Sequence, residues 1–317
     1  MKKILSRLKP YLRWVILGGT LFFLAKALKD NWREVAAIRI EPAGWAALTL
    51  ALGVTLLAHI WSGWVWGWIL QTFKQPVSNV WAVMVYLKTN IAKYLPGNVW
   101  HFYGRIKAVT GLGASLGVAT LSVLLEPLLM AAAALLIALM GSQQLNWGLQ
   151  LLALVAVLGG IHPRVLNPIL DYLKRVKGKV SQSTRSETAD PSVTEAPPEN
   201  AQEASYQLKR YPLVPLLGEV GFVGLRGVGF VLTFLPFVNL SADQVPSIMS
   251  AFSLAWLLGL VIPGAPGGIG VFEATALALL DGQFSSAILL SAVALYRLIS
   301  VIAEAAGAGL VWLDERR

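Results

Sequence analysis

The sequence predicts an all-α integral membrane protein, a polytopic helical bundle of about six full spans and two oppositely oriented re-entrant hairpins. The first observation is composition: the mean hydropathy is +0.63 and 14% of residues are charged, whereas soluble domains carry about 25%. The second is a series of apolar segments near the ~20 residues that cross a bilayer. The third is a pair of apolar segments broken by proline and glycine, which survive at membrane depth only where protein or water satisfies the backbone.

Charge and cysteine content limit the function classes. The net charge of +9 is typical of a membrane protein with lysine and arginine in its cytoplasmic loops, so we expect no nucleic-acid partner. The chain has no cysteine, which excludes disulfides, thiolate catalysis and cysteine-ligated metal. No cofactor and no metal site are expected.

The expected spans follow from the apolar segments in chain order. They are residues 14–28, 43–70, 113–141, 147–161, 213–237 and 284–313. We interpret 14–28 as an uncleaved helix, although Ala25-Lys-Ala27 has the small residues of a signal-peptidase site. The segment 29–42 is interpreted as an interfacial helix.

The distribution of basic residues predicts the topology of a single transmembrane domain, residues 1–317. Residues 162–212 form the one long hydrophilic loop and carry eight lysines and arginines, which assigns this loop and both termini to the cytoplasm. Its centre, 181–205, is rich in Ser, Thr, Glu and Pro and predicts disorder. Lys29, Arg33 and Arg39 conflict with this assignment. A multi-pass protein of the plasma membrane is expected.

The count of spans then requires each broken segment to enter and leave on one side. Residues 80–104 would open to the cytoplasm, with Lys93, Pro96 and Gly97 at their tip, and residues 246–280 would open to the outside. The second tip contains Pro263, Gly264, Gly267, Gly268 and Gly270, followed by Glu273. Two inverted span–hairpin–span units are typical of transporters whose site lies where broken helices meet. The alternative is two proline-kinked helix pairs.

Charged residues inside the apolar segments mark candidate binding residues, because each needs a partner or water. Arg105 follows the first tip, and Glu126, Arg226 and Arg297 lie near the middle of spans. Glu219 and Glu304 each lie two turns from an arginine, and Glu126 is the expected counter-ion of Arg226 or Arg297. Two readings remain open: arginines that bind a phosphate through their planar fork, or structural ion pairs. A helix that begins after Gly270 would also point its positive end at an anion.

Several motifs resemble one family. Lys93-Tyr-Leu-Pro-Gly-Asn-Val-Trp100 is followed by Arg105, Glu126 lies in Leu124-Leu-Glu-Pro127, and Pro266-Gly-Gly-Ile-Gly-Val-Phe-Glu273 is followed by Tyr296-Arg297. From about residue 11 to 312 the chain resembles the lysylphosphatidylglycerol synthase transmembrane (flippase-like) family, without the soluble aminoacyl-transferase domain. Pro127 departs from the family, which often has arginine there.

The resemblance implies a protein that binds an anionic phospholipid or a polyprenol-linked head group and moves the lipid between leaflets. One alternative is a membrane-embedded glycosyltransferase or other lipid-modifying enzyme with Glu126 or Glu273 as general base. Another is an accessory scaffold whose partner is a lipid-synthesis enzyme. The candidate binding residues are Lys93, Pro96, Gly97, Arg105, Glu126, Arg226, Pro263, Gly264, Gly267, Gly268, Gly270, Glu273 and Arg297.

Overall fold

The computed structural model describes residues 39–94, 99–141, 147–168, 210–262 and 266–316, together with Lys29 and Leu208. Within these residues the regular structure is helical and contains no β-strand. The expected span 14–28, the loop centre 181–205 and the tip residues Pro96, Gly97, Pro263 and Gly264 lie outside the described residues.

Five of the described helices are long and apolar enough to cross a membrane. They are α3 (Pro42–Thr72), α6 (Leu116–Ala138), α9 (Leu213–Leu232), α10 (Gln244–Val261) and α12 (Ser286–Asp314). Four of them match expected spans, and the set is consistent with a helical membrane protein. The expected span at α7 (Trp147–Ile161) has 15 residues, fewer than the ~20 of a typical span. Helix α10 has a span's length and composition although the sequence predicts it as one arm of a hairpin.

Serine and proline residues fix where several helices begin. The side chains of Ser78, Ser115 and Ser285 accept hydrogen bonds from the backbone N–H three residues later, which satisfies donors that the first helical turn leaves free. Helix α3 begins at Pro42, where the missing N–H costs nothing. The boundaries therefore follow from local chemistry.

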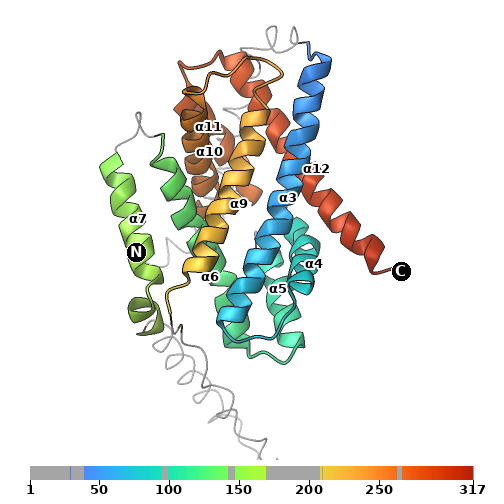
Figure 1. Cartoon of the computed structure of the whole chain (residues 1–317), viewed down its shortest axis with the longest axis vertical. Helices are drawn as coiled ribbons and strands as arrows, with labels where there is room; N and C mark the ends of the chain where they lie inside the picture. The colour runs from blue at the N-terminus through green and yellow to red at the C-terminus, as the bar shows by residue number, and fades with distance from the viewer. Residues whose placement is uncertain are drawn as a thin grey trace, which may run out of the picture.

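The long helices pack around α3, α6 and α9. Helix α3 packs against α9, α12 and α4 (Asn79–Asn90), and α6 packs against α9, α10 and the peripheral α7 (Figure 1). The run Ala131–Ala134 of α6 is buried, and such small side chains let transmembrane helices approach closely.

An aromatic cluster forms the core between α9, α10, α11 (Val271–Leu280) and α12. Phe230, Phe252, Phe272 and Tyr296 contribute one ring from each helix, and all pairs of ring centroids lie 5.2 to 5.8 Å apart. Edge-on and stacked aromatic pairs add about 0.5–1.5 kcal/mol beyond their burial. This cluster fixes α10 and α11 to the rest of the bundle.

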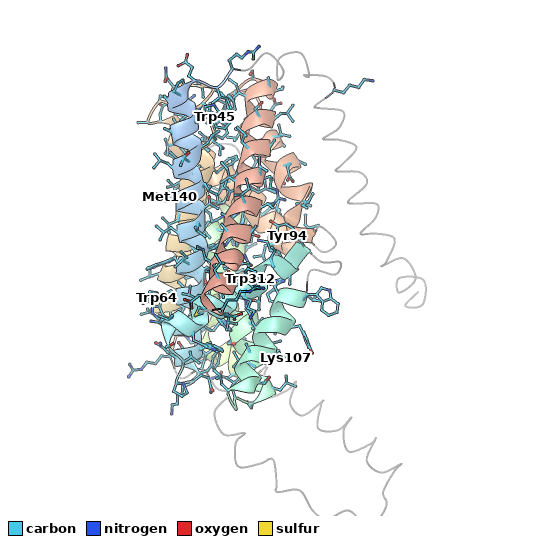
Figure 2. The ribbon with its side chains drawn as sticks, turned by 90° about the vertical axis from the view of Figure 1, so that its right-hand side faces the viewer. Trp45, Trp64, Tyr94, Lys107, Met140 and Trp312 are labelled. Carbon is cyan, nitrogen blue, oxygen red and sulfur yellow. The ribbon has the colours of Figure 1, made fainter. Side chains whose placement is uncertain are left out.

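The two broken segments lie in opposite halves of the molecule and meet at their tips. The first consists of α4, the 3-10 turn η1 (Ile91–Tyr94) and α5 (Trp100–Gly111), and the second of α10, η4 (Pro266–Gly268) and α11. Figure 1 shows α4 and α5 in the lower half and α10 and α11 in the upper half, and η1 contacts η4. Tyr94, in η1, lies near mid-height of the bundle (Figure 2).

A close approach of backbone to ring defines the junction of the tips. Gly267 has φ +60°, and a Cβ atom on it would lie 2.9 Å from Cε1 of Tyr94. Glycine is required there for both reasons, since L side chains rarely adopt this φ and no space remains for one. The tips are therefore in direct contact.

Candidate functional site

A cavity of about 150 Å³ lies where the two tips meet. Its lining comes from both broken segments and from α3, α6, α9 and α12, and it contains four cationic side chains and two carboxylates. The cations are Lys93, Arg105, Arg226 and Arg297, and the carboxylates are Glu126 and Glu304. Their pairing defines the chemistry of the site.

Glu304 of α12 is the centre of the first group of charges. Its Oε1 atom lies 2.6 Å from Nζ of Lys93, 3.2 Å from Nε2 of His59 and 3.9 Å from Nη1 of Arg226. The glutamate is 2% exposed, and its carboxylate joins α12 to η1, α3 and α9.

Arg226 is oriented by neutral partners more than by the carboxylate. Its Nε atom donates to the hydroxyl of Tyr296 at 2.7 Å and its Nη2 atom donates to Oγ of Ser300 at 3.3 Å. Its Nη1 atom lies 3.1 Å from Nε2 of His59. Lys93 and Arg226 therefore share a single carboxylate, Glu304, while the guanidinium plane is held by α12 and α3.

Arg105 and Glu126 form a second, fully buried pair. Nη1 of Arg105 donates to Oε2 of Glu126 at 2.6 Å, and the guanidinium lies 3.7 Å from the ring centroid of Tyr86. This pairing corrects the sequence prediction, which assigned Glu126 to Arg226 or Arg297. The reason is geometric, because α5, which carries Arg105, packs directly on α6. Arg226 instead contacts α12, and Arg297 contacts the second tip.

Arg297 holds the second tip from α12. Its Nε atom donates to Oε1 of Glu273, and its Nη1 atom donates to the carbonyl oxygen of Gly267 at 2.9 Å. The other carboxylate oxygen of Glu273 accepts from the N–H of Gly270 at 2.6 Å. The anion expected at the start of α11 is thus the chain's own Glu273, placed where a helix N-terminus favours negative charge.

The structure brings most of the described candidate residues together. Seven of them line the cavity and two adjoin it through the α11 cap. The lining residues are Lys93, Arg105, Glu126, Arg226, Gly267, Gly268 and Arg297, and the adjoining ones are Gly270 and Glu273. Pro96, Gly97, Pro263 and Gly264 lie outside the described residues.

Sequence reasoning left several lining residues out of the candidate set. Glu304 had a usable signal, since it lies two turns from Arg297 on the same helix face. His59 could also have been identified, because an ionisable residue inside a membrane span is rare and indicates a functional or paired position. Tyr86 and Tyr94 line the cavity too, and nothing in their spacing indicates it.

Several buried polar atoms around the cavity have no hydrogen-bond partner among the described residues. They include Nδ1 of His59, Nδ1 of His101, Nη2 of Arg297 and Oε2 of Glu304. An unsatisfied buried donor or acceptor costs about 1–3 kcal/mol, and such groups in native structures call for an explanation. The cavity therefore has unused capacity to bind a polar ligand, including a guanidinium nitrogen that can donate.

Comparison of the chain with protein-family models and with curated proteins gives no match.

Proposed function

We propose that the chain binds the anionic head group of a phospholipid or lipid-linked intermediate in this cavity and moves the lipid between the leaflets of the membrane. The observation that carries the proposal is the excess of cationic side chains over carboxylates in the lining of the cavity where the two tips meet. The sequence motifs that resemble the lysylphosphatidylglycerol synthase transmembrane family support the same activity.

The charge pairing favours an anionic ligand. Glu126 pairs with Arg105 and Glu273 with Arg297, which leaves Glu304 for both Lys93 and Arg226. A buried charge without its own partner is strongly unfavourable. A phosphate would supply the missing negative charge and accept from the planar guanidinium fork.

The arrangement of the broken segments supports movement as well as binding. We interpret α4–η1–α5 and α10–η4–α11 as re-entrant hairpins that enter from opposite sides of the membrane, because they occupy opposite halves of the bundle and meet at their tips (Figure 1). A head group at this junction would reach one side when the first tip withdraws and the other when the second withdraws. Transporters built from inverted repeats use this principle.

The enzyme alternative needs Glu126 or Glu273 to act as a general base. Each carboxylate already accepts a hydrogen bond from an arginine, so it could act as a base only after that contact breaks. The scaffold alternative needs no chemistry in the cavity. The experiment below separates both from transport.

The test is transbilayer movement in proteoliposomes. Fluorescent phosphatidylglycerol and phosphatidylcholine are incorporated into separate vesicles, and dithionite quenching reports the fraction of each lipid that reaches the outer leaflet. We expect the protein to accelerate movement of the anionic lipid, and Arg226→Gln to abolish most of that acceleration.

The matched control for this assay is Arg316→Gln, because Arg316 is an exposed arginine that lies over the ring of Trp312. It should move lipid at the wild-type rate. Equal rates with and without protein, for both lipids, would contradict the proposed function. Conversion of a lipid-linked sugar in the vesicles would favour the enzyme instead.

The proposed topology has a separate test that uses the absence of native cysteine. Single cysteines replace Lys74, between α3 and α4, and Asn239, between α9 and α10, both of which are exposed. We expect a membrane-impermeant maleimide to label Asn239→Cys from outside the cell and Lys74→Cys only after permeabilisation. Labelling of both from the same side would overturn the inverted arrangement.

A further inference from the structure

One buried carboxylate outside the cavity lining has no hydrogen-bond partner in the part of the chain that the structure describes. Glu219, the seventh residue of α9, is 0% exposed, and neither of its carboxylate oxygens has a hydrogen-bond partner among the described residues. Its electrostatic neighbours are Glu126 and Arg105, and Tyr86 also lies within its field. The glutamate therefore lies within the electrostatic field of the Arg105–Glu126 pair, and no described residue hydrogen-bonds its carboxylate.

The protonation of this carboxylate follows from its surroundings. An ionised carboxylate buried without a partner is so unfavourable that such groups take up a proton instead. Arg105 is the neighbouring cation, but its guanidinium already donates to Glu126 and lies against the ring of Tyr86. Glu219 is thus the neutral member of a pair of acids and Glu126 is the ionised one.

The described elements packed against α9 supply no other charged group to this carboxylate. From α3, His59 faces Glu304 and Arg226. Helix α10 contains no Asp, Glu, Lys, Arg or His between Gln244 and Val261, and on α12 Arg297 and Glu304 are engaged at the tips. The hydroxyl oxygen of Tyr86 on α4 accepts a hydrogen bond from Oγ of Ser62. Proton exchange with Glu219 is therefore directed to Glu126, which lines the cavity.

We propose that Glu219 and Glu126 form a proton-binding site that shares the Arg105 guanidinium, so that the cavity takes up a proton together with its anionic ligand. In the transfer step the O–H bond of Glu219 breaks as an O–H bond to Glu126 forms. Glu219 then becomes the carboxylate that faces Arg105, and the total charge of the three groups is unchanged.

A second proton from water in the cavity has a different effect, because it leaves both acids neutral. Arg105 then has no carboxylate partner and can bind an anionic head group. This part of the inference rests on the proposed function, whereas the proton site itself does not.

The direct test is infrared spectroscopy of the purified protein at neutral pH in H₂O and D₂O, without added lipid substrate. A protonated carboxylic acid gives a carbonyl stretching band that ionised carboxylates and amides lack. We expect the wild type to show this band and Glu219→Gln to lose it, because Glu126 then remains as the carboxylate bound to Arg105. Absence of the band from the wild type, or its persistence in Glu219→Gln, would overturn the proposal.

A second variant covers the case in which Glu219→Gln does not fold. Glu219→Asp keeps an acid at the position and should shift the band instead of removing it, and an unshifted band would overturn the assignment to Glu219. In proteoliposomes, anionic-lipid movement should accelerate as the pH falls in the wild type and become independent of pH in the double variant Glu219→Gln/Glu126→Gln, which has neither acid. A pH-independent wild type with active transport would overturn the link to Arg105, whereas a correct infrared result with no transport would refute only the proposed function.

Discussion

The two broken segments meet at one cavity but carry opposite polarity. The tip of the first segment presents the cation Lys93, which contacts Glu304 of α12 at 2.6 Å. The tip of the second segment presents acceptors, the carbonyl of Gly267 and the carboxylate of Glu273, which both bind Arg297 of α12. The two residues of α12 are seven positions apart, about two helical turns or roughly 10 Å. One helix thus holds both tips through charges of opposite sign.

The surroundings of the two segments differ as well. The first is anchored by a buried ion pair, Arg105–Glu126, whereas the second is anchored by the aromatic cluster around Phe272 and Tyr296. The ion pairs that an anionic ligand could disrupt therefore lie in the first segment and on α12. The second segment contributes mainly aromatic packing, and its polar groups are confined to the tip. Removing one anchor at a time tests this division.

The largest effect is expected from Glu304→Ala. The substitution leaves Lys93, Arg226 and His59 without their shared carboxylate, and breaking a buried ion pair costs about 3–5 kcal/mol. The free energy of unfolding in detergent measures the loss. The control on the same helix is Glu315→Ala, whose pair with Lys88 is exposed at 42% and 56% and is worth about 0–1 kcal/mol. Similar losses for both variants would contradict the role of Glu304.

The second effect concerns the anchor of the first segment. Arg105→Met leaves the carboxyl group of Glu126 buried beside Glu219 without its cation, and we expect a loss of about 3 kcal/mol in the free energy of unfolding. Adding Glu126→Gln to this variant removes the unpartnered acid and should restore part of the stability. A double variant no more stable than Arg105→Met would show that the two side chains are not an energetic pair.

The third effect concerns the anchor of the second segment. Arg297→Lys keeps the charge but not the planar fork that reaches Glu273 and the Gly267 carbonyl together. Loss of one such charged hydrogen bond costs about 1.5–3 kcal/mol. Arg316→Lys, an exchange at an exposed arginine, should change unfolding by less than about 0.5 kcal/mol. Full wild-type stability of Arg297→Lys would argue against the tip contact.

The smallest effect isolates the contact between the tips. Gly267→Ala introduces a side chain at φ +60° and places its Cβ 2.9 Å from Tyr94, whereas Gly113→Ala introduces one at φ +87° with nothing within 4 Å. Each pays about 1–2 kcal/mol for the left-handed backbone, so the difference in unfolding free energy between the variants measures the clash with Tyr94. No difference would mean that the tips separate freely.

The sequence predicted the helices of this fold better than the pairing of the charged side chains that they carry. Apolar length predicted α3, α6, α9 and α12, and the run of prolines and glycines correctly marked the break before α11. These features are local. The partner of Glu126 is not a local property, because the choice between Arg105, Arg226 and Arg297 depends on which helices pack together.

The α11 cap shows a second limit of sequence reasoning. A glycine followed three residues later by glutamate is compatible both with a helix that binds a ligand and with one that caps itself. The structure selects the second, since Gly270 donates to Glu273. Tyr86 and Tyr94 were missed for a related reason: a tyrosine in an apolar segment carries no sign that its ring will face a cavity.

The central claim is that the cationic side chains lining the cavity at the junction of the two tips bind an anionic head group. Native mass spectrometry of the purified protein with short-chain phosphatidylglycerol and phosphatidylcholine measures this directly. The account predicts preferential retention of the anionic lipid and a loss of about tenfold or more in its affinity for Arg226→Gln, the consequence of losing a charged hydrogen bond. Equal retention of both lipids, unchanged in Arg226→Gln, would contradict it.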